Sequence, residues 1–143
     1  MQTNLKWACA VTTVYQRKDT LLPLTLASIK AAGFPNPRLC VDGMGGGFDH
    51  FGLEVTYRRE QIRTHGNWIL AAMELFIREP HAARYGIFQD DFIAYRNTRQ
   101  YLDQCEYPAK GYLNLTTFDG RPGSSNEKVV DGQPVGWYES AEL

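Results

Sequence analysis

The sequence has no long apolar run, no excess of charge of either sign and few cysteines. None of its apolar runs approaches the roughly 20 residues that a helix needs to cross a bilayer, so we expect no membrane span. The 15 basic and 16 acidic side chains give a formal charge of −1, which argues against a broadly basic surface that binds nucleic acid. The N-terminus, Met1 to Lys6, lacks the apolar stretch of a signal peptide, and we therefore expect a cytoplasmic protein.

The 3 cysteines are Cys9, Cys40 and Cys105, which lie far apart among apolar neighbours. This distribution is typical of reduced core cysteines in a cytosolic protein and predicts neither a disulfide framework nor a zinc site. With 143 residues, of which 43% are hydrophobic and 22% charged, the chain suits a globular protein with a buried core. We expect a single domain over residues 1–143.

Strand and helix patterns alternate along the chain. Strands are expected at residues 7–14, 38–42, 53–57, 85–88 and 111–118. Helical faces are expected at Leu22, Leu26 and Ile29; at Trp68, Ala72, Leu75 and Phe76 in a helix opened by Asn67; and in a third helix from Asn97. Residues 119–134 are polar and rich in Gly, Ser and Pro, which predicts a long loop.

This alternation predicts a three-layer α/β sandwich with a mostly parallel central sheet. In such sheets ligands bind beyond the carboxyl ends of the strands. The side chains that follow the strands are polar, and we expect them to gather on that edge: Thr12, Thr13, Tyr15, Arg17, Asp42, Asp90 and Asp91.

The strongest single signal is the segment Phe88-Gln89-Asp90-Asp91-Phe92, in which two adjacent carboxylates follow a strand. Like charges this close repel unless a cation or hydrogen-bond donors compensate them. Mg²⁺ or Mn²⁺ is the simplest compensator, because both ions prefer oxygen ligands. The alternative interpretation is an exposed turn with two solvated acids.

The order of these parts resembles that of a GT-A glycosyltransferase, an enzyme that uses a nucleoside-diphosphate sugar. The first strand ends in Thr12-Thr13-Val14-Tyr15-Gln16-Arg17, the second ends in Val41-Asp42, and a Gly66-Asn67 helix precedes the strand that ends in the acidic pair. The motifs are most similar to those of the branch that contains N-acetylglucosaminyltransferase I and to those of family 2-like members. The resemblance covers roughly Trp7 to Leu102 and implies a Rossmann-like GT-A sandwich.

The resemblance also implies roles for individual residues. Thr12, Thr13, Tyr15, Arg17, Gly66 and Asn67 would belong to the nucleotide-sugar site. Asp42 would accept the N3–H of uracil, Asp91 would bind Mn²⁺ or Mg²⁺, and Asp90 would contact the ribose, the sugar or a metal-bound water. Gln89 departs from the pattern, since an acidic residue stands at that place in this branch.

The implied activity is metal-dependent transfer of a sugar from a UDP-sugar to an acceptor hydroxyl. The acceptor is open: a glycan, a small molecule, a protein or a modified nucleic acid. The base that takes the acceptor's proton would come from the second half of the domain, where Asp119, Asp131 and Glu139 are weak candidates. Family members are usually longer, so we expect a truncated or minimal form in which residues 119–143 begin the acceptor half.

Two alternatives stay open at this point. The first is a nucleotide-sugar-binding module that lacks a base or acts with a partner chain. The second is a nucleotidyltransferase. Such an enzyme needs a glycine-rich loop with basic residues directly after the first strand, and the residues from Thr12 to Gln16 contain no such loop. The glycine-rich segment 43–47 predicts a mobile loop. We interpret His65 as an ordinary residue at the start of a helix. We interpret Arg58, Arg59 and Arg63 as a basic cluster exposed to solvent.

Overall fold

The computed structural model describes residues 5–104 and, beyond them, the short segments 112–113, 128–130, 133–135 and 137–138. The chain divides into two compact units, Met1–Asp103 and Gln104–Leu143. The candidate base residues Asp119, Asp131 and Glu139, and the third cysteine, Cys105, lie outside the described residues.

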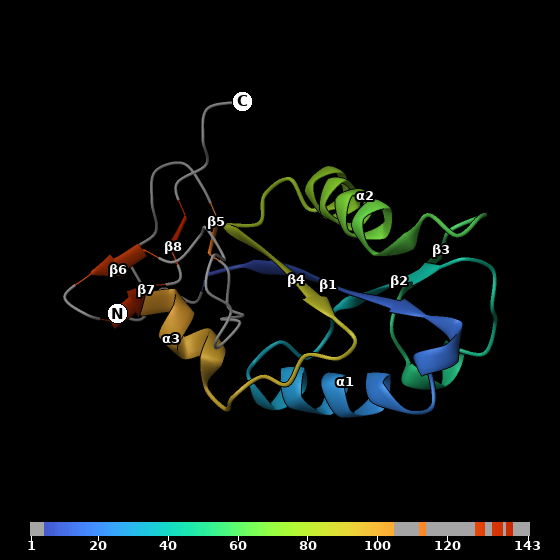
Figure 1. Ribbon diagram of the computed structural model, residues 1–143, viewed down its shortest axis with the longest axis horizontal. Helices are drawn as coiled ribbons and strands as arrows, with labels where there is room; N and C mark the ends of the chain where they lie inside the picture. The colour runs from blue at the N-terminus through green and yellow to red at the C-terminus, as the bar shows by residue number, and fades with distance from the viewer. Residues whose placement is uncertain (1–4, 105–111, 114–127, 131–132, 136, 139–143) are drawn as a thin grey trace. The chain divides into compact units, whose positions relative to one another are not determined.

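The first unit is built on a four-stranded parallel sheet. Its strands are β1 (Trp7–Val14), β2 (Arg38–Asp42), β3 (Val55–Tyr57) and β4 (Arg84–Gln89), in the order β3-β2-β1-β4 (Figure 1). All three pairings are parallel. The predicted α/β class and the parallel pairing of the first four strands are therefore confirmed.

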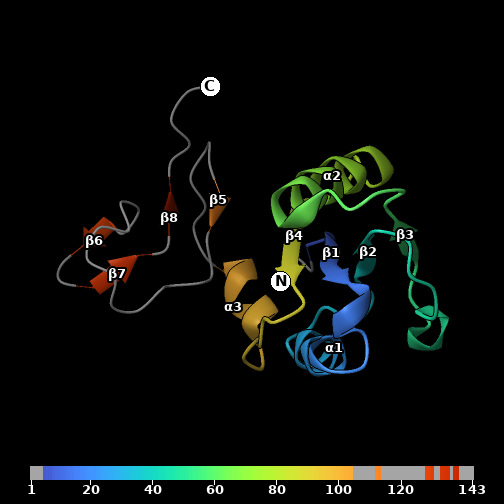
Figure 2. The ribbon, with the colours of Figure 1, turned by 45° about the vertical axis from the view of Figure 1, so that its right-hand side comes forward.

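Helices cover both faces of this sheet. Helix α1 (Leu21–Ala31) lies on one face and α2 (Arg63–Arg78) on the opposite face, as Figures 1 and 2 show. Helix α3 (Thr98–Gln104) follows β4, and the short 3₁₀ turns η1 (Tyr15–Arg17) and η2 (Asp49–Phe51) interrupt the connections after β1 and β2. None of the helices in the described residues is long and apolar enough to span a membrane.

Helix α2 corrects the sequence prediction at its start and on its buried face. It begins at Arg63 rather than at Asn67, and it buries Asn67, Ala71 and Leu75 against the sheet. The predicted inward residues Trp68 and Phe76 are 45% and 64% exposed. Apolar side chains occur on nearly every side of this helix, so periodicity alone could not choose the face, and a polar residue occupies the buried row because its amide is fully bonded there.

The described strands of the second unit form two small antiparallel pairs. Strand β5 (Tyr112–Leu113) pairs with β8 (Trp137–Tyr138), and β6 (Lys128–Val130) pairs with β7 (Gln133–Val135). The prediction of an unbroken loop over 119–134 is wrong at β6 and β7. The sequence has an Asp-Gly dipeptide between these two segments, Lys-Val-Val and Gln-Pro-Val, and this dipeptide is a hairpin signal that the polar composition around it obscures.

The core of the first unit lies between the sheet and its two helix layers. Ala10, Val11, Leu39 and Val41 are completely buried. Cys9 and Cys40 are free thiols within the sheet, and burial raises the pKa of Cys9 to about 12 and that of Cys40 to about 11. Both thiols are therefore protonated and unreactive at neutral pH.

Truncation of Leu39 tests this core. Leu39→Ala removes a fully buried side chain from a central strand and leaves a cavity, so we expect a loss of about 3 kcal/mol in the free energy of unfolding. Urea denaturation followed by circular dichroism measures it. Leu24→Ala, on an α1 residue that is 62% exposed, is the matched control, and we expect it to change stability by about 0.5 kcal/mol or less. Equal effects of the two substitutions would contradict this assignment of the core.

Candidate functional site

The strand register brings the polar strand ends to one edge of the sheet. Thr12 lies opposite both Gln89 of β4 and Cys40 of β2, and Val14 lies opposite Asp42. The residues that follow β1 and β4 and the last residue of β2 therefore meet, as expected for parallel strands of similar length.

Asp90 is the most constrained side chain at this edge and is only 3% exposed. Its Oδ2 accepts a hydrogen bond from Thr13 Oγ1 at 2.8 Å, and its Oδ1 lies 2.6 Å from Nη1 of Arg17. Its backbone N–H donates to the carbonyl of Thr12 at 3.1 Å, and its carbonyl accepts from the buried Thr25 hydroxyl at 2.7 Å. Donors and a guanidinium thus compensate a buried carboxylate that would otherwise be costly.

Asp91 lies beside it and is far more open, with a side chain 49% exposed. Its Oδ2 is 3.3 Å from the same Arg17 nitrogen, so one cation stands between the two carboxylates. Hydrogen bonding to Asp90, followed by the charges of Asp90 and Asp91, raises the pKa of Arg17. The acidic pair is therefore arranged to hold positive charge, although no group of three or more His, Cys, Asp or Glu residues within the described ranges could enclose a metal.

A cleft of about 680 Å³ opens at the same edge. It is lined by Tyr15 and Gln16 of η1, by Asp42, by the glycine-rich segment 43–46 and by residues 59–61. Since Arg17 belongs to the same turn as Tyr15 and Gln16, the acidic pair and the cleft share one structural element. Both polar and apolar atoms line the cleft, as in sites that bind an aromatic ring through a few hydrogen bonds.

Asp42 is the charged group at the base of this cleft and is 6% exposed. Its Oδ1 accepts a hydrogen bond from the backbone N–H of Ile62 at 2.8 Å, which fixes the orientation of the carboxylate. Its second oxygen makes no hydrogen bond within the part of the chain that the structure describes. A well-oriented acceptor therefore remains available to a ligand in the cleft.

Two glycines let the chain pass close to neighbouring side chains around the cleft. Gly43 has φ +93°, and a Cβ added there would lie 3.0 Å from Cγ of Gln61. A Cβ at Gly45 would lie 2.6 Å from the ring of Tyr15. Larger residues would push the segment away from these side chains, so the glycines shape the cleft.

The structure brings most of the predicted site residues together. Thr12, Thr13, Tyr15, Arg17, Asp42, Asp90 and Asp91 all lie at the carboxyl edge. Asn67 does not line the cleft: its amide donates to the Cys40 carbonyl at 2.8 Å and accepts from Arg58 at 2.9 Å. Gly66 lies in the first turn of α2 against Ile62. These two residues serve helix packing in this structure.

Three residues that line the cleft, Arg59, Glu60 and Gln61, are not among the predicted site residues. Arg59 is exposed, as the interpretation of a solvated basic cluster predicts, and no motif marks the other two. The turn signal after the third strand was present, but its position beside Asp42 depends on the register of β2 and β3. Arg58 from the same basic cluster is 7% exposed, so the prediction that it is solvated is wrong.

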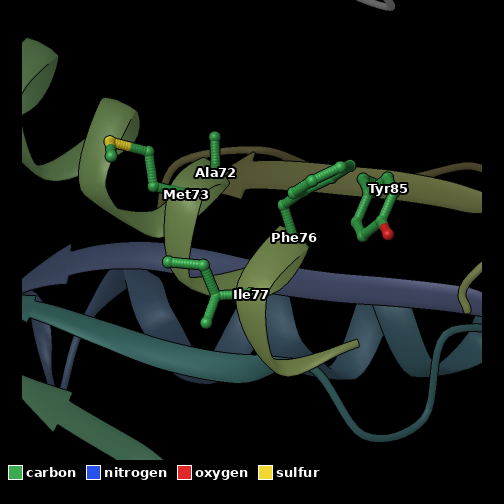
Figure 3. Close-up of a pocket in the computed structure, with 5 residues that line it drawn as sticks. All are labelled: Ala72, Met73, Phe76, Ile77 and Tyr85. Atoms are coloured by element: carbon green, nitrogen blue, oxygen red, sulfur yellow. The ribbon is translucent and has the colours of Figure 1, made fainter. Parts of the chain in front are cut away.

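A second groove, of about 440 Å³, lies between α2 and β4 and is lined by Ala72, Met73, Phe76, Ile77 and Tyr85 (Figure 3). The rings of Phe76 and Tyr85 pack with their centroids 5.6 Å apart. Its lining is almost wholly apolar and holds no group that could bind phosphate or a metal. The polar edge is therefore the better candidate site.

Comparisons of this chain with protein-family models, with curated proteins and with solved structures find no match.

Removal of the Arg17 guanidinium tests its pairing with the buried carboxylate. In Arg17→Met, Asp90 loses its only cationic partner among the described residues, and we expect the protein to lose about 1 kcal/mol of stability because the arginine is partly exposed and screened. Denaturation at low and high salt measures the loss, which should shrink as salt rises. Lys30→Met, an exposed change on α1, is the control and should be neutral. A neutral Arg17→Met would rule out this electrostatic role.

Proposed function

We propose that this domain binds a nucleoside-diphosphate sugar, most favourably a UDP-sugar, and acts as a metal-dependent glycosyltransferase of the GT-A type. One observation carries the proposal: Asp42, a buried carboxylate whose second oxygen has no hydrogen-bond partner among the described residues, lines a cleft that adjoins the acidic pair and its partner Arg17. One end of such a site suits a base and the other suits a charged diphosphate.

The base preference follows from the hydrogen-bonding character of Asp42. An ionised carboxylate only accepts hydrogen bonds, so it favours a base that presents a ring N–H. Uracil and thymine present N3–H and guanine presents N1–H in this way, whereas adenine has no ring N–H on its pairing edge. Among the three, the resemblance to the GT-A family favours uracil. The half-exposed ring of Tyr15 lines the same cleft, with Nζ of Lys18 over it at 5.2 Å from the ring centroid, and its open part suits contact with a base.

The acidic pair fits a hard divalent cation such as Mn²⁺ or Mg²⁺. Such ions are commonly held by one or two carboxylates together with substrate phosphates, which needs no third protein ligand. Asp91 would be the direct ligand because its carboxylate is half-exposed, while Asp90 is engaged by Thr13 and Arg17. The bound ion would neutralise negative charge on the departing nucleoside diphosphate.

Arg17 has a second task in this proposal. Its guanidinium already balances the acidic pair, and its side chain is 42% exposed. With a divalent ion held at Asp91, Arg17 would be able to pair with the oxygens of the diphosphate, for which a planar guanidinium is well suited.

A nucleotide-sugar-binding module without transfer activity is the second candidate. It requires only the cleft and the acidic pair, and no base for an acceptor hydroxyl. The two functions differ in one product: transfer or hydrolysis of the donor releases UDP in the presence of Mn²⁺, and binding alone does not.

Calorimetric titration of UDP, GDP, ADP and dTDP, each with and without Mn²⁺, tests the donor site. We expect the highest affinity for UDP with Mn²⁺, the lowest for ADP, and a loss of at least 10-fold when the metal is omitted, because the negative diphosphate then approaches the acidic pair with Arg17 as the counter-charge and without the two charges of the ion. Absence of binding by all four nucleotides would reject the proposed site.

Two substitutions separate the two ends of the site. Asp91→Asn should remove the Mn²⁺ dependence of UDP binding. Asp42→Asn keeps an acceptor for Ile62 but turns a donor toward the base, so we expect a 10- to 100-fold loss of UDP affinity, on the order of 1.5–3 kcal/mol, with Mn²⁺ binding unchanged. Asp49→Asn, an exposed acid on η2, is the control. Identical losses in both site variants would contradict the division of roles.

A further inference from the structure

The segment 58–62 joins β3 to α2 and is attached to β2 at both of its ends. The backbone N–H of Arg58 donates to the carbonyl of Val41 at 2.9 Å. The backbone N–H of Ile62 donates to Oδ1 of Asp42 at 2.8 Å. The residues between these anchors, 59–61, line the cleft. Their positions relative to Asp42 therefore depend on how firmly the two ends are held.

Arg58 holds the first end by more than its backbone. Its side chain is 7% exposed, its Nε donates to Oδ1 of Asn67 at 2.9 Å, and its Nη1 forms an ion pair with Oε1 of Glu74. Asn67, which is 2% exposed, also donates a hydrogen bond from its side-chain amide to the carbonyl of Cys40 in β2 at 2.8 Å. One guanidinium thus ties the segment to α2 and, through Asn67, to β2.

Stability alone is a poor account of this arrangement. Burying a charged pair costs desolvation, and well-packed apolar residues in the same place are often at least as stable. Nη2 of Arg58 and Oε2 of Glu74 are buried without a hydrogen-bond partner within the described residues, which adds to that cost. What a planar guanidinium supplies, and an apolar side chain does not, is a fixed direction for the chain that carries it.

We propose that Arg58, with Asn67 and Glu74, is a positioning residue that sets the base selectivity of the cleft by fixing residues 59–61 beside Asp42. This inference rests on the proposed nucleotide function. Gln61 shows the effect most directly, since its Cγ lies against the backbone of Gly43 at the wall of the cleft. A ring that enters the cleft meets Glu60 and Gln61 at positions that the buried cluster determines, and so discrimination among nucleoside bases depends on a side chain that does not contact the base.

Arg58→Lys tests the proposal, because lysine keeps a positive charge near Glu74 but has no second nitrogen to bind Asn67 at the same time. The matched control is Arg38→Lys, which alters an ion-paired arginine at the opposite end of β2. In the ligand-free protein, amide hydrogen exchange measured by NMR should be at least 10-fold faster at Ile62 in Arg58→Lys, and unchanged at Val11 in the core. In titrations with Mn²⁺, the ratio of the Kd for GDP to that for UDP should fall at least 5-fold toward unity, with the affinity for Mn²⁺ alone unchanged.

The outcomes distinguish this proposal from the one on which it rests. A wild-type protein that binds none of the nucleoside diphosphates overturns the proposed function and the selectivity with it. A wild-type protein that prefers UDP, with the same preference and the same Ile62 exchange in Arg58→Lys, overturns the positioning role alone. Faster exchange spread evenly over the whole sheet also overturns it, because the residue is then only structural. If Arg58→Lys does not fold, Glu74→Gln takes its place, with the same expected changes at Ile62 and in the Kd ratio.

Discussion

The carboxylate of Asp90 is the interaction on which the edge of the sheet depends. Although only 3% exposed, it is met by the hydroxyl of Thr13 and the guanidinium of Arg17, and its own backbone is bonded to Thr12 and Thr25. Strand β1, the turn that follows it and helix α1 are therefore all fastened to the end of β4. Because burial of an uncompensated charge is costly, these contacts support one another. The same bonds therefore hold these elements together and balance the charge of the candidate site.

Asp42, the last residue of β2, likewise belongs both to the fold and to the candidate site. One of its oxygens accepts a hydrogen bond from Ile62, at the end of the β3–α2 connection, and Asp42 itself lines the cleft. The segment that it holds is fixed at its far end by the buried Arg58 cluster. Residues that line the cleft and residues that hold the chain in place are consequently close neighbours, and we expect that a substitution that leaves the cleft lining intact can still change its shape. The groove between α2 and β4 differs from this edge, because its lining is apolar and carries no group that could bind phosphate or a metal (Figure 3).

The sequence patterns that predicted the fold correctly depend on neighbouring residues in the chain. The run from Trp7 to Val14 is β-branched and apolar because it is buried on both sides, and the acidic pair follows β4 directly in the chain. The errors have local causes too. Helix α2 carries apolar side chains on most of its surface, so its buried face could not be chosen from periodicity, and no local signal shows that the Asn67 amide bonds to Cys40 and Arg58. The 128–135 hairpin was hidden by a polar composition that describes its surroundings rather than its two short strands.

By itself, the sequence determined the class of fold and the identity of the polar residues at the strand ends, because alternation of strands and helices fixes parallel pairing and parallel pairing gathers the carboxyl ends. The tertiary structure decided which of those residues meet. It placed Arg17 between two acids, buried Arg58 instead of exposing it, and brought residues 59–61 beside Asp42. The physical reason is that composition and spacing record what each residue prefers, whereas pairing of charges and closure of a cleft depend on register and on distances between segments far apart in the chain.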